Sequence, residues 1–430
     1  MSRRAVRLAL LTEWGPCMTT AESTTRIPEI RVPGLLTLAG LIAGLVLGLL
    51  LGGNAAGDAV LSVATPVGSL WLKALKMTIL PLVCALLFTG IIETAAAARA
   101  GAMARRTLGW IAGLLAVSAI AGGTVMPLLL QLSPAPAGIA VEGPSEPTVL
   151  PGLGDFFASL VPDNVIAAAS ESAMLPVIVF TALFALAASR LGEAQRRHLA
   201  LFFEAIMGAM LVIIGWVLWL APIGVFGLGF TLTAQSGAAA IGALAHYILL
   251  VSSVGALFLL GAYPVAMFAG RLSPARFARE VLPAQVVALS TQSSLASVPP
   301  MLASATRLGV SATTAEFVLP LAVTLFRVTS PAMNVAVVVY AAALAGTDLS
   351  PAMIASGVLV AYITTFGTVS LPGTISFIAS TGPIAAAMGV PLWPLGVLVA
   401  VEMLPDIMRT VGNVTMDVAV TAAVDAGERD

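Results

Sequence analysis

Apolar runs of about 20 residues recur along this chain from residue 34 onward, and they restrict its fold more than any other feature. A helix of that length spans the roughly 30 Å hydrocarbon core of a bilayer. Of the 430 residues, 59% are hydrophobic and 10% are charged, and the mean hydropathy is +1.03. An ordinary soluble protein is charged at about a quarter of its positions. The sequence therefore predicts an all-α, multi-pass membrane protein.

The charge balance and the scarce cysteine and histidine exclude several classes of function. The chain has 20 Lys+Arg and 21 Asp+Glu, a net charge of −1, which excludes a nucleic-acid-binding protein. Cys17 and Cys84 are isolated, and the only histidines are His198 and His246. These residues provide neither a zinc cluster nor a nucleophile with its base. We therefore expect neither an enzyme nor a bound cofactor.

Two apolar stretches, 281–308 and 351–389, are interrupted by polar runs that contain proline, and in the second also glycine. Their arms are too short to cross a bilayer, and irregular backbone is tolerated inside a membrane only where it lines a polar cavity. We expect two re-entrant hairpins, although ordinary Ser/Thr contacts between helices are an alternative. The other runs predict eight transmembrane helices, at 34–53, 62–92, 107–132, 153–189 (a broken pair), 201–230, 240–269, 312–346 and 392–425.

The basic residues predict the topology. Loops that carry arginine alternate with loops that contain no Lys or Arg, so the positive-inside rule makes both termini cytoplasmic. Residues 1–33 form a cytoplasmic tail, with initiation at Met1 or Met18 left open, 34–425 a single membrane domain, and 426–430 a second tail. The arginines on the cytoplasmic side are Arg3, Arg4, Arg7, Arg26, Arg31, Arg99, Arg105, Arg106, Arg190, Arg196, Arg197, Arg271, Arg276 and Arg279.

The last predicted helix carries a polar stripe, because its polar residues recur mostly every three or four positions. An ionisable group at the centre of a span costs at least about 2.5–3.5 kcal/mol, so the stripe is expected to face an aqueous cavity. A closed salt-bridge ladder that only joins helices is the alternative. Each hairpin also precedes a polar helix, and such an inverted repeat is typical of transporters with a midplane site. The stripe consists of Glu402, Asp406, Arg409, Thr410, Asn413 and Asp417.

The chemistry of this stripe suits a small anionic substrate. Arg409 can hold a carboxylate through two parallel hydrogen bonds, and Asp406 can receive an ammonium group. Asn413 can bond a second carboxylate. Asp417 suits a hard cation such as sodium, helped by the carbonyls of a broken helix.

The segment Glu402–Asp417 reads EMLPDIMRTVGNVTMD, and it resembles the last transmembrane helix of the glutamate transporter family, the dicarboxylate/amino acid:cation symporters. The similarity covers about residues 34–425 and is most specific in this helix. Further matches are Ser293-Ser294, Phe317–Leu321, Gly367-Thr368 with Pro372-Gly373, and Ala221–Phe226.

The resemblance implies a homotrimer in the lipid bilayer that works as an elevator, with the second hairpin as the extracellular gate. Helices 1, 2, 4 and 5 would form a scaffold, and helices 3, 6, 7 and 8 with both hairpins a mobile transport unit. Arg409 would bind the side-chain carboxylate of the substrate, and Asp406 its amino group. Matching positions imply substrate binding by Ser294, Ser330, Asp406, Arg409, Thr410 and Asn413, and sodium binding by Thr324, Thr365, Thr368, Asn413 and Asp417.

The chain departs from the family in helix seven. The family's Asn-Met-Asp-Gly-Thr corresponds here to 326–330, which reads FRVTS, so two oxygen ligands are lost and a guanidinium is added. Pro331 is expected to break this helix. We hypothesise that Arg327, paired with Glu402, Asp406 or Asp417, supplies positive charge in place of a sodium ion. Coupling would then use fewer sodium ions or a proton; snorkelling of Arg327 to an interface is the alternative.

Four other charged residues are expected to be structural. Lys73 and Lys76 are expected to snorkel toward the outer interface, and Glu204 and Glu316 lie at cytoplasmic helix ends.

The function predicted from these features is secondary active import of an acidic amino acid, glutamate or aspartate, across the cell membrane with sodium and/or protons. Asp406 favours an amino acid, because a second buried carboxylate repels a substrate without an ammonium group. If Arg327 neutralises Asp406, C4-dicarboxylate symport is the alternative. An anion channel or a non-transporting binding protein on the same scaffold is a further alternative.

Overall fold

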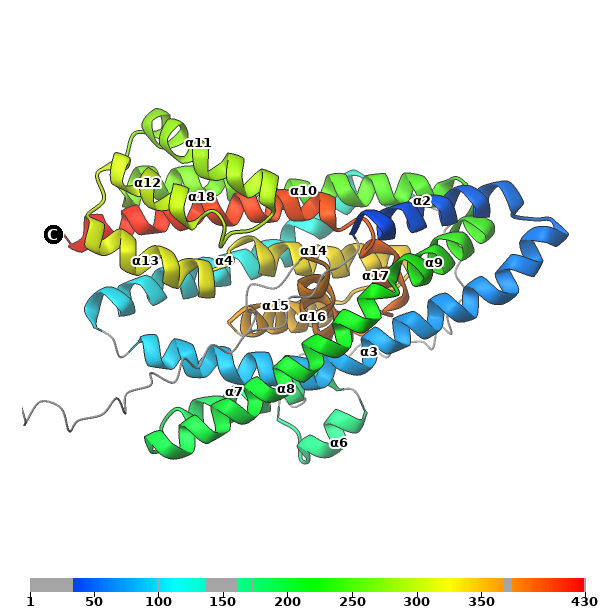
Figure 1. Ribbon diagram of the computed structural model, residues 1–430, viewed down its shortest axis with the longest axis horizontal. Coiled ribbons are helices and arrows are strands. Elements are labelled where there is room, and N and C mark those ends of the chain that lie inside the picture. The colour runs from blue at the N-terminus through cyan, green and yellow to red at the C-terminus, as the bar shows by residue number, and fades with distance from the viewer. Residues whose placement is uncertain (1–33, 99–100, 137–160, 172, 367–372, 429–430) are drawn as a thin grey trace, which may run out of the picture.

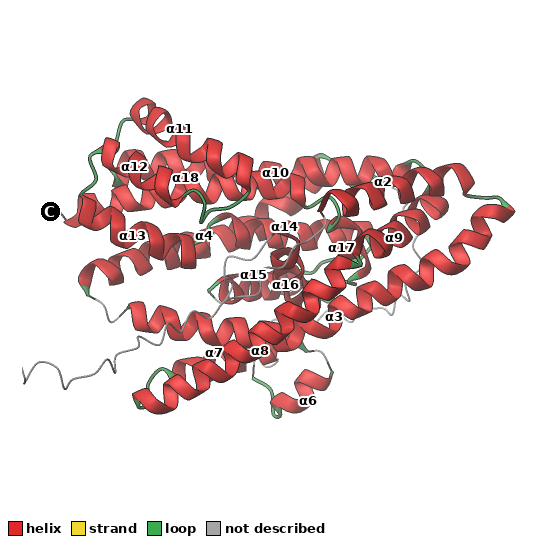
Figure 2. Cartoon of the chain, in the orientation of Figure 1, coloured by secondary structure: helices red, strands yellow, loops and turns green. Residues whose placement is uncertain are grey.

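The computed structural model describes residues 34–98, 101–136, 161–171, 173–366 and 373–428. Every regular element within these ranges is a helix (Figures 1 and 2). Five helical segments of this part of the chain are long and apolar enough to cross a membrane. Large apolar side chains such as Leu50, Leu70 and Trp216 are each 68% exposed, which suits contact with lipid. The protein is therefore a helical membrane protein.

The helices are α2 (Gly34–Leu51), α3 (Ala55–Ala97), α4 (Ala102–Leu132), α6 (Val165–Ser170), α7 (Met174–Ala188), α8 (Glu193–Trp219), α9 (Ala221–Ser236), α10 (Ala239–Pro264), η1 (Val265–Ala269), α11 (Pro274–Thr291), α12 (Val298–Leu308), α13 (Ala312–Leu325), α14 (Thr329–Leu344), α15 (Pro351–Thr365), α16 (Gly373–Ala387), α17 (Trp393–Leu398) and α18 (Met403–Glu428).

Several helix ends follow from local sequence. The side chains of Asn54, Ser311 and Ser350 each accept a backbone N–H in the first turn of α3, α13 and α15, respectively. Such caps satisfy donors that have no partner within the helix. α12 ends at Gly309, whose φ of 89° lies in the left-handed region that glycine adopts without strain.

Helices α2, α3, α8 and α9 pack together on one side of the molecule (Figure 1). The contact between α2 and α9 depends on Gly40, Gly44 and Gly48, because a Cβ at any of them would collide with α9. Small residues spaced by four positions allow two helix backbones to approach closely inside a membrane.

Helices α14 and α18 lie inside the molecule. Residues 329–342 of α14 are all buried, and so are residues 409–425 of α18. α18 packs against α10, α11, α12 and α13, and Figure 1 shows it alongside α10. The polar stripe on α18 therefore faces protein rather than lipid.

Each predicted hairpin is a pair of packed helices. In the first, Arg307 at the end of α12 forms a 2.6 Å ion pair with Glu280 near the start of α11, so the two ends lie together. In the second, Ser356 of α15 donates a 2.8 Å hydrogen bond to the carbonyl of Ala387 at the end of α16.

The structure corrects four predicted boundaries. The first hairpin begins at Pro274 rather than 281. The first turns of α11 are polar, so hydropathy alone does not assign them to the hairpin. The predicted helix 201–230 is interrupted at Leu220, between α8 and α9. The predicted helix 392–425 consists of α17 and α18, so Glu402 lies in the turn before α18.

The fourth correction concerns helix seven. Its break lies at 326–328, whereas Pro331 stands in the first turn of α14. Proline is tolerated in a first turn because its missing N–H would have no partner within the helix.

Candidate functional site

The break between α13 and α14 is held by side chains from neighbouring helices. The Ser118 hydroxyl of α4 donates to the carbonyl of Val328 and accepts the N–H of Ala332 at 3.1 Å. Oδ1 of Asn413 on α18 accepts both the N–H of Thr329, at 3.0 Å, and its hydroxyl, at 2.9 Å. Buried backbone outside a helix needs such partners, since water is excluded. The broken segment is therefore an anchored part of the interior.

The guanidinium of Arg409 is the centre of the site. It donates to Oδ1 of Asn334 at 2.9 Å and to Oε1 of Glu402 at 2.7 Å, and its Nε lies 3.2 Å from Oδ1 of Asp406. The Tyr247 hydroxyl donates to the other oxygen of Glu402 at 2.7 Å. All five side chains are buried. α10, α14, α18 and the turn before α18 thus converge on one arginine.

In this cluster Arg409, Glu402 and Asp406 are paired with one another, as in the salt-bridge ladder that the sequence left open. Two carboxylates hold one guanidinium, and an amide completes its ring of acceptors. Removing one partner of a buried ion pair costs about 3–5 kcal/mol, because the other charge is left uncompensated. The three acceptors nevertheless belong to separate side chains. A substrate carboxylate can therefore replace one of them while the guanidinium keeps its hydrogen bonds to the other two.

Asp417 lies two turns further along α18 and is fully buried. Both of its carboxylate oxygens accept no hydrogen bond from the described residues. The guanidinium of Arg327, at the break of helix seven, interacts electrostatically with both Asp417 and Asp406. A buried carboxylate is stable only with compensating positive charge or with a proton. Asp417 therefore offers two free oxygens to a cation.

Two more residues predicted to bind substrate lie near this cluster. Ser330 is buried in the first turn of α14, and Thr410 is buried on α18, where its hydroxyl donates to the carbonyl of Asp406 at 3.0 Å. The structure therefore brings Ser330, Asp406, Arg409, Thr410 and Asn413 to one region of the interior.

Four predicted ligands come from other segments. Ser294 is partly exposed in the connection between α11 and α12, and Thr324 is exposed on α13, where its hydroxyl donates to the carbonyl of Pro320. Thr365 is buried at the end of α15, and its hydroxyl donates to the carbonyl of Ala361 at 2.6 Å. Thr368 lies outside the described residues.

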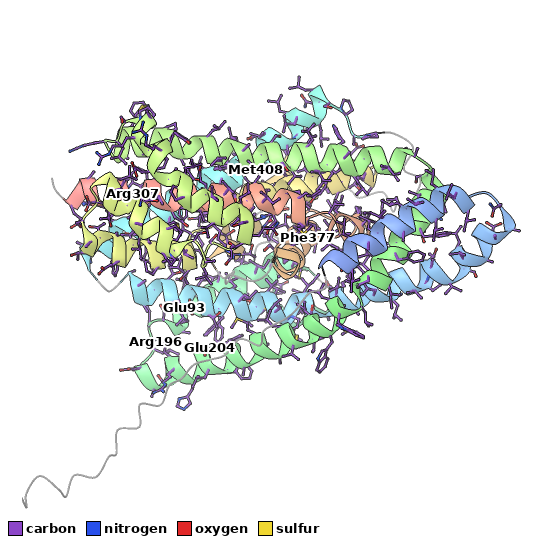
Figure 3. The ribbon with its side chains drawn as sticks, turned by 45° about the horizontal axis from the view of Figure 1, so that its top comes forward. Glu93, Arg196, Glu204, Arg307, Phe377 and Met408 are labelled. Atoms are coloured by element: carbon purple, nitrogen blue, oxygen red, sulfur yellow. The ribbon has the colours of Figure 1, made fainter. Side chains whose placement is uncertain are left out.

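The remaining charged candidates stay outside the cluster. Lys73, Lys76 and Glu316 are exposed. Glu204 on α8 lies beside Glu93 of α3, far from Met408, the neighbour of Arg409 (Figure 3). Glu316 lies in the second turn of α13, close to the helix end predicted for it, whereas Glu204 lies in the interior of α8 rather than at its end.

Sequence reasoning missed three side chains that complete the site: Ser118, Tyr247 and Asn334. Each is one of several scattered polar residues in a largely apolar helix, which is a signal too weak to separate a ligand from an ordinary helix contact. Only the packing of α4, α10 and α14 around α18 identifies them.

Comparisons with known proteins identify the family of this chain. Residues 35–426 match the family model described as the Sodium:dicarboxylate symporter family. The chain is 28% identical over 395 residues to the "Proton/sodium-glutamate symport protein" of Bacillus subtilis, an alignment that covers 89% of this chain and 90% of that protein.

Two further relatives are similar at a comparable level. The "Proton/glutamate-aspartate symporter" of Escherichia coli is 26% identical over 373 residues, which is 83% of each chain. The "C4-dicarboxylate transport protein" of Rhodopseudomonas palustris (strain HaA2) is 26% identical over 373 residues, 85% of this chain and 82% of that protein.

Proposed function

The chain belongs to the sodium:dicarboxylate symporter family, and on that premise we propose that it is a secondary active symporter of a small anionic substrate. It imports an acidic amino acid, glutamate or aspartate, together with sodium and/or protons. Relatives named as glutamate, glutamate-aspartate and C4-dicarboxylate transporters support cation-coupled transport of this substrate class.

The observation that carries this proposal is the buried guanidinium of Arg409, surrounded by acceptors that belong to separate side chains. Arg409 has the planar, forked donors that match a carboxylate, and its present partners come from three different segments of the chain. A substrate carboxylate that replaces one of these partners gains a charge-assisted hydrogen bond pair in a region shielded from water. Asp406 then becomes available for the substrate's ammonium group, and Ser294, Ser330, Thr410 and Asn413 for its remaining polar groups.

C4-dicarboxylate symport is the second candidate, because Arg327 interacts electrostatically with Asp406. A guanidinium that compensates Asp406 removes the repulsion that this carboxylate exerts on a second substrate carboxylate. The choice between the two substrates therefore depends on how strongly Arg327 is held by Asp406 rather than by Asp417.

The coupling ion is proposed to bind at Asp417. Its two free oxygens and the amide of Asn413 are oxygen ligands of the kind that sodium prefers, and Thr324, Thr365 and Thr368 are proposed for a second sodium position, as the resemblance implies. Arg327 would supply one positive charge to the same region, which lowers the number of cations that must enter. Glu402 is the second carboxylate proposed to take part in coupling.

The proposed membrane architecture follows the family. Residues 34–425 act as one transporter domain with eight transmembrane helices and two re-entrant hairpins, both termini in the cytoplasm, and three copies in the membrane. Helices 1, 2, 4 and 5 form the scaffold, and helices 3, 6, 7 and 8 with both hairpins move as an elevator. The extensive packing of α9 against α2 and α3, and of α8 against α3, supports this division, while α3 also contacts α16 of the proposed mobile unit.

The proposal is tested with purified protein in proteoliposomes and radiolabelled aspartate and succinate. Inward sodium and proton gradients are imposed separately and together. Accumulation above the outside concentration that depends on a cation gradient supports symport, whereas uptake that only equilibrates indicates a channel. Absence of binding and uptake for both substrates would refute the roles given to Asp406 and Arg409.

A further inference from the structure

A column of hydrogen-bonding side chains leads from the surface of the protein to Glu402. It begins at Ser133, which follows α4 and is exposed. The Ser133 hydroxyl lies 3.0 Å from Nε2 of His246 on α10, and Nδ1 of His246 lies 3.1 Å from the Tyr340 hydroxyl on α14. At the inner end, the Tyr247 hydroxyl donates to Glu402 at 2.7 Å. Exposure decreases along the column from Ser133 to the buried Glu402.

The hydrogen-bond directions define how His246 is protonated. The Tyr340 hydroxyl has one proton, and it donates that proton to the carbonyl of Ala243 at 2.7 Å. Tyr340 must therefore accept from Nδ1 of His246, which carries a proton there. Nε2 then accepts from Ser133 when His246 is neutral and donates to it when His246 is charged.

The two halves of the column meet at a pair of tyrosine rings. The centroids of Tyr247 and Tyr340 are 5.4 Å apart, with the ring planes tilted by 59°. Both side chains are fully buried. No hydrogen bond joins the two hydroxyls among the described residues, so transfer between them requires the Tyr340 hydroxyl to rotate away from Ala243 and one water molecule, or a closer approach of the two side chains, to bridge them.

Among the described residues, few other titratable groups surround the column. Besides Tyr340, α14 has no titratable side chain, and α9 has none. Arg105 and Arg106 of α4 lie at the opposite end of that helix from Ser133. Near Glu402 the charged groups are Asp406 and Arg409 of α18, with Arg327 beyond Asp406.

We infer that His246, Tyr340 and Tyr247 form a proton relay that links the outer face of the protein to Glu402. This inference rests on the proposed symport and names the proton as a coupling ion. Ser133 and His246 adjoin loops that contain no Lys or Arg, which is the side opposite the cytoplasm by the positive-inside rule.

The transfer conserves protons at every step. A proton binds Nε2 of His246, and the Nδ1 proton moves to the oxygen of Tyr340. Tyr340 passes its own proton to Tyr247, which passes its own to Oε2 of Glu402. Each tyrosine gains and loses one proton, and Glu402 keeps the one that entered.

The consequence is a link between outside pH and substrate binding. A protonated Glu402 is neutral and no longer forms an ion pair with Arg409, whose NH2 group it now holds at 2.7 Å. The released guanidinium binds a substrate carboxylate more readily. Protons and substrate therefore bind cooperatively, as a symporter requires.

The test is the dependence of the initial uptake rate on outside pH between 5 and 8, measured in proteoliposomes with the labelled substrate that the wild type transports, because a relay sets the rate at which protons reach Glu402 and not their equilibrium binding. We expect the wild-type initial rate to fall by tenfold or more as outside pH rises across this range. His246→Gln and Tyr340→Phe should each flatten this dependence to less than twofold, and the double variant should not differ from either single variant. The control is His198→Gln, because His198 is the other histidine, is exposed, and lies beside Arg196 and Arg197.

Several outcomes would overturn the relay. A wild-type pH dependence that persists in His246→Gln refutes it. A dependence lost in His246→Gln but kept in Tyr340→Phe indicates an electrostatic effect of the histidine alone and also refutes it. Melting temperatures identify a variant that fails to fold, in which case the other single variant decides. If the wild type transports neither aspartate nor succinate, the symport proposal fails, and its failure is thereby separated from that of the relay.

Discussion

Replacing Arg409 by lysine separates the geometry of the guanidinium from its charge. The arginine contacts Asn334, Glu402 and Asp406 through three different nitrogens, at 2.9, 2.7 and 3.2 Å. A lysine ammonium keeps the positive charge but cannot present two parallel donors to a carboxylate. Arg409→Lys should therefore weaken substrate binding while leaving most of the fold intact.

The magnitude follows from the bonds lost. Changing from two charge-assisted hydrogen bonds to one removes about 1.5–3 kcal/mol, which is about a 10- to 150-fold rise in Kd. Arg409→Met has a different effect, because it leaves Glu402 and Asp406 buried without their cation. It should destabilise the protein by about 3–5 kcal/mol.

The assay combines two measurements on the same detergent-purified samples. Equilibrium dialysis with labelled substrate gives Kd, and thermal denaturation gives the stability. The matched control is Arg307→Lys, since Arg307 also pairs with a carboxylate, Glu280, but its side chain is 44% exposed. If Arg409→Lys binds substrate within twofold of the wild type, Arg409 is not the partner of the substrate carboxylate and the reasoning fails.

Three further predictions concern the cation region and the helix packing. Arg327→Met should make substrate uptake more dependent on sodium and shift its pH dependence, measured with separately imposed gradients; unchanged coupling would contradict the role of Arg327 as an internal cation. Asp417→Asn should abolish the rise in melting temperature that sodium gives the wild type, and a sodium effect of wild-type size would exclude Asp417 as the ligand. Gly44→Ala should lower stability by about 1–3 kcal/mol because its Cβ collides with the backbone of α9. The matched control Gly109→Ala, with open space around its Cβ, should melt at or above the wild-type temperature.

The helical membrane character and the polar stripe were predictable because both follow from local sequence. Long apolar runs indicate helices that lie in lipid. The spacing of Asp406, Arg409, Asn413 and Asp417 indicates that these residues share one face of a helix. Helix seven is broken, as predicted, but the break lies at 326–328 and not at Pro331. Proline disrupts only the residues before it in a helix interior, whereas Pro331 lies in a first turn and so permits the helix to start.

The partners of the stripe could not be predicted, since they come from segments more than 60 residues away in the chain. Asn334 lies 75 residues from Arg409, and Tyr247 lies 155 residues from Glu402. No local pattern encodes such distances, because helix packing inside a membrane depends on shape and small residues rather than on a hydrophobic period.

The sequence by itself therefore determined that the chain enters a membrane, which helix carries the ionisable groups, and which family it resembles. Only the tertiary structure decided that Glu402, Asp406 and Asn334 together hold Arg409, and that Asp417 keeps two free oxygens near Arg327. The physical reason is the low polarity of the interior. Burying a charge in this interior costs free energy unless an opposite charge lies beside it. The packing of helices that are distant in the chain determines which residue supplies that opposite charge.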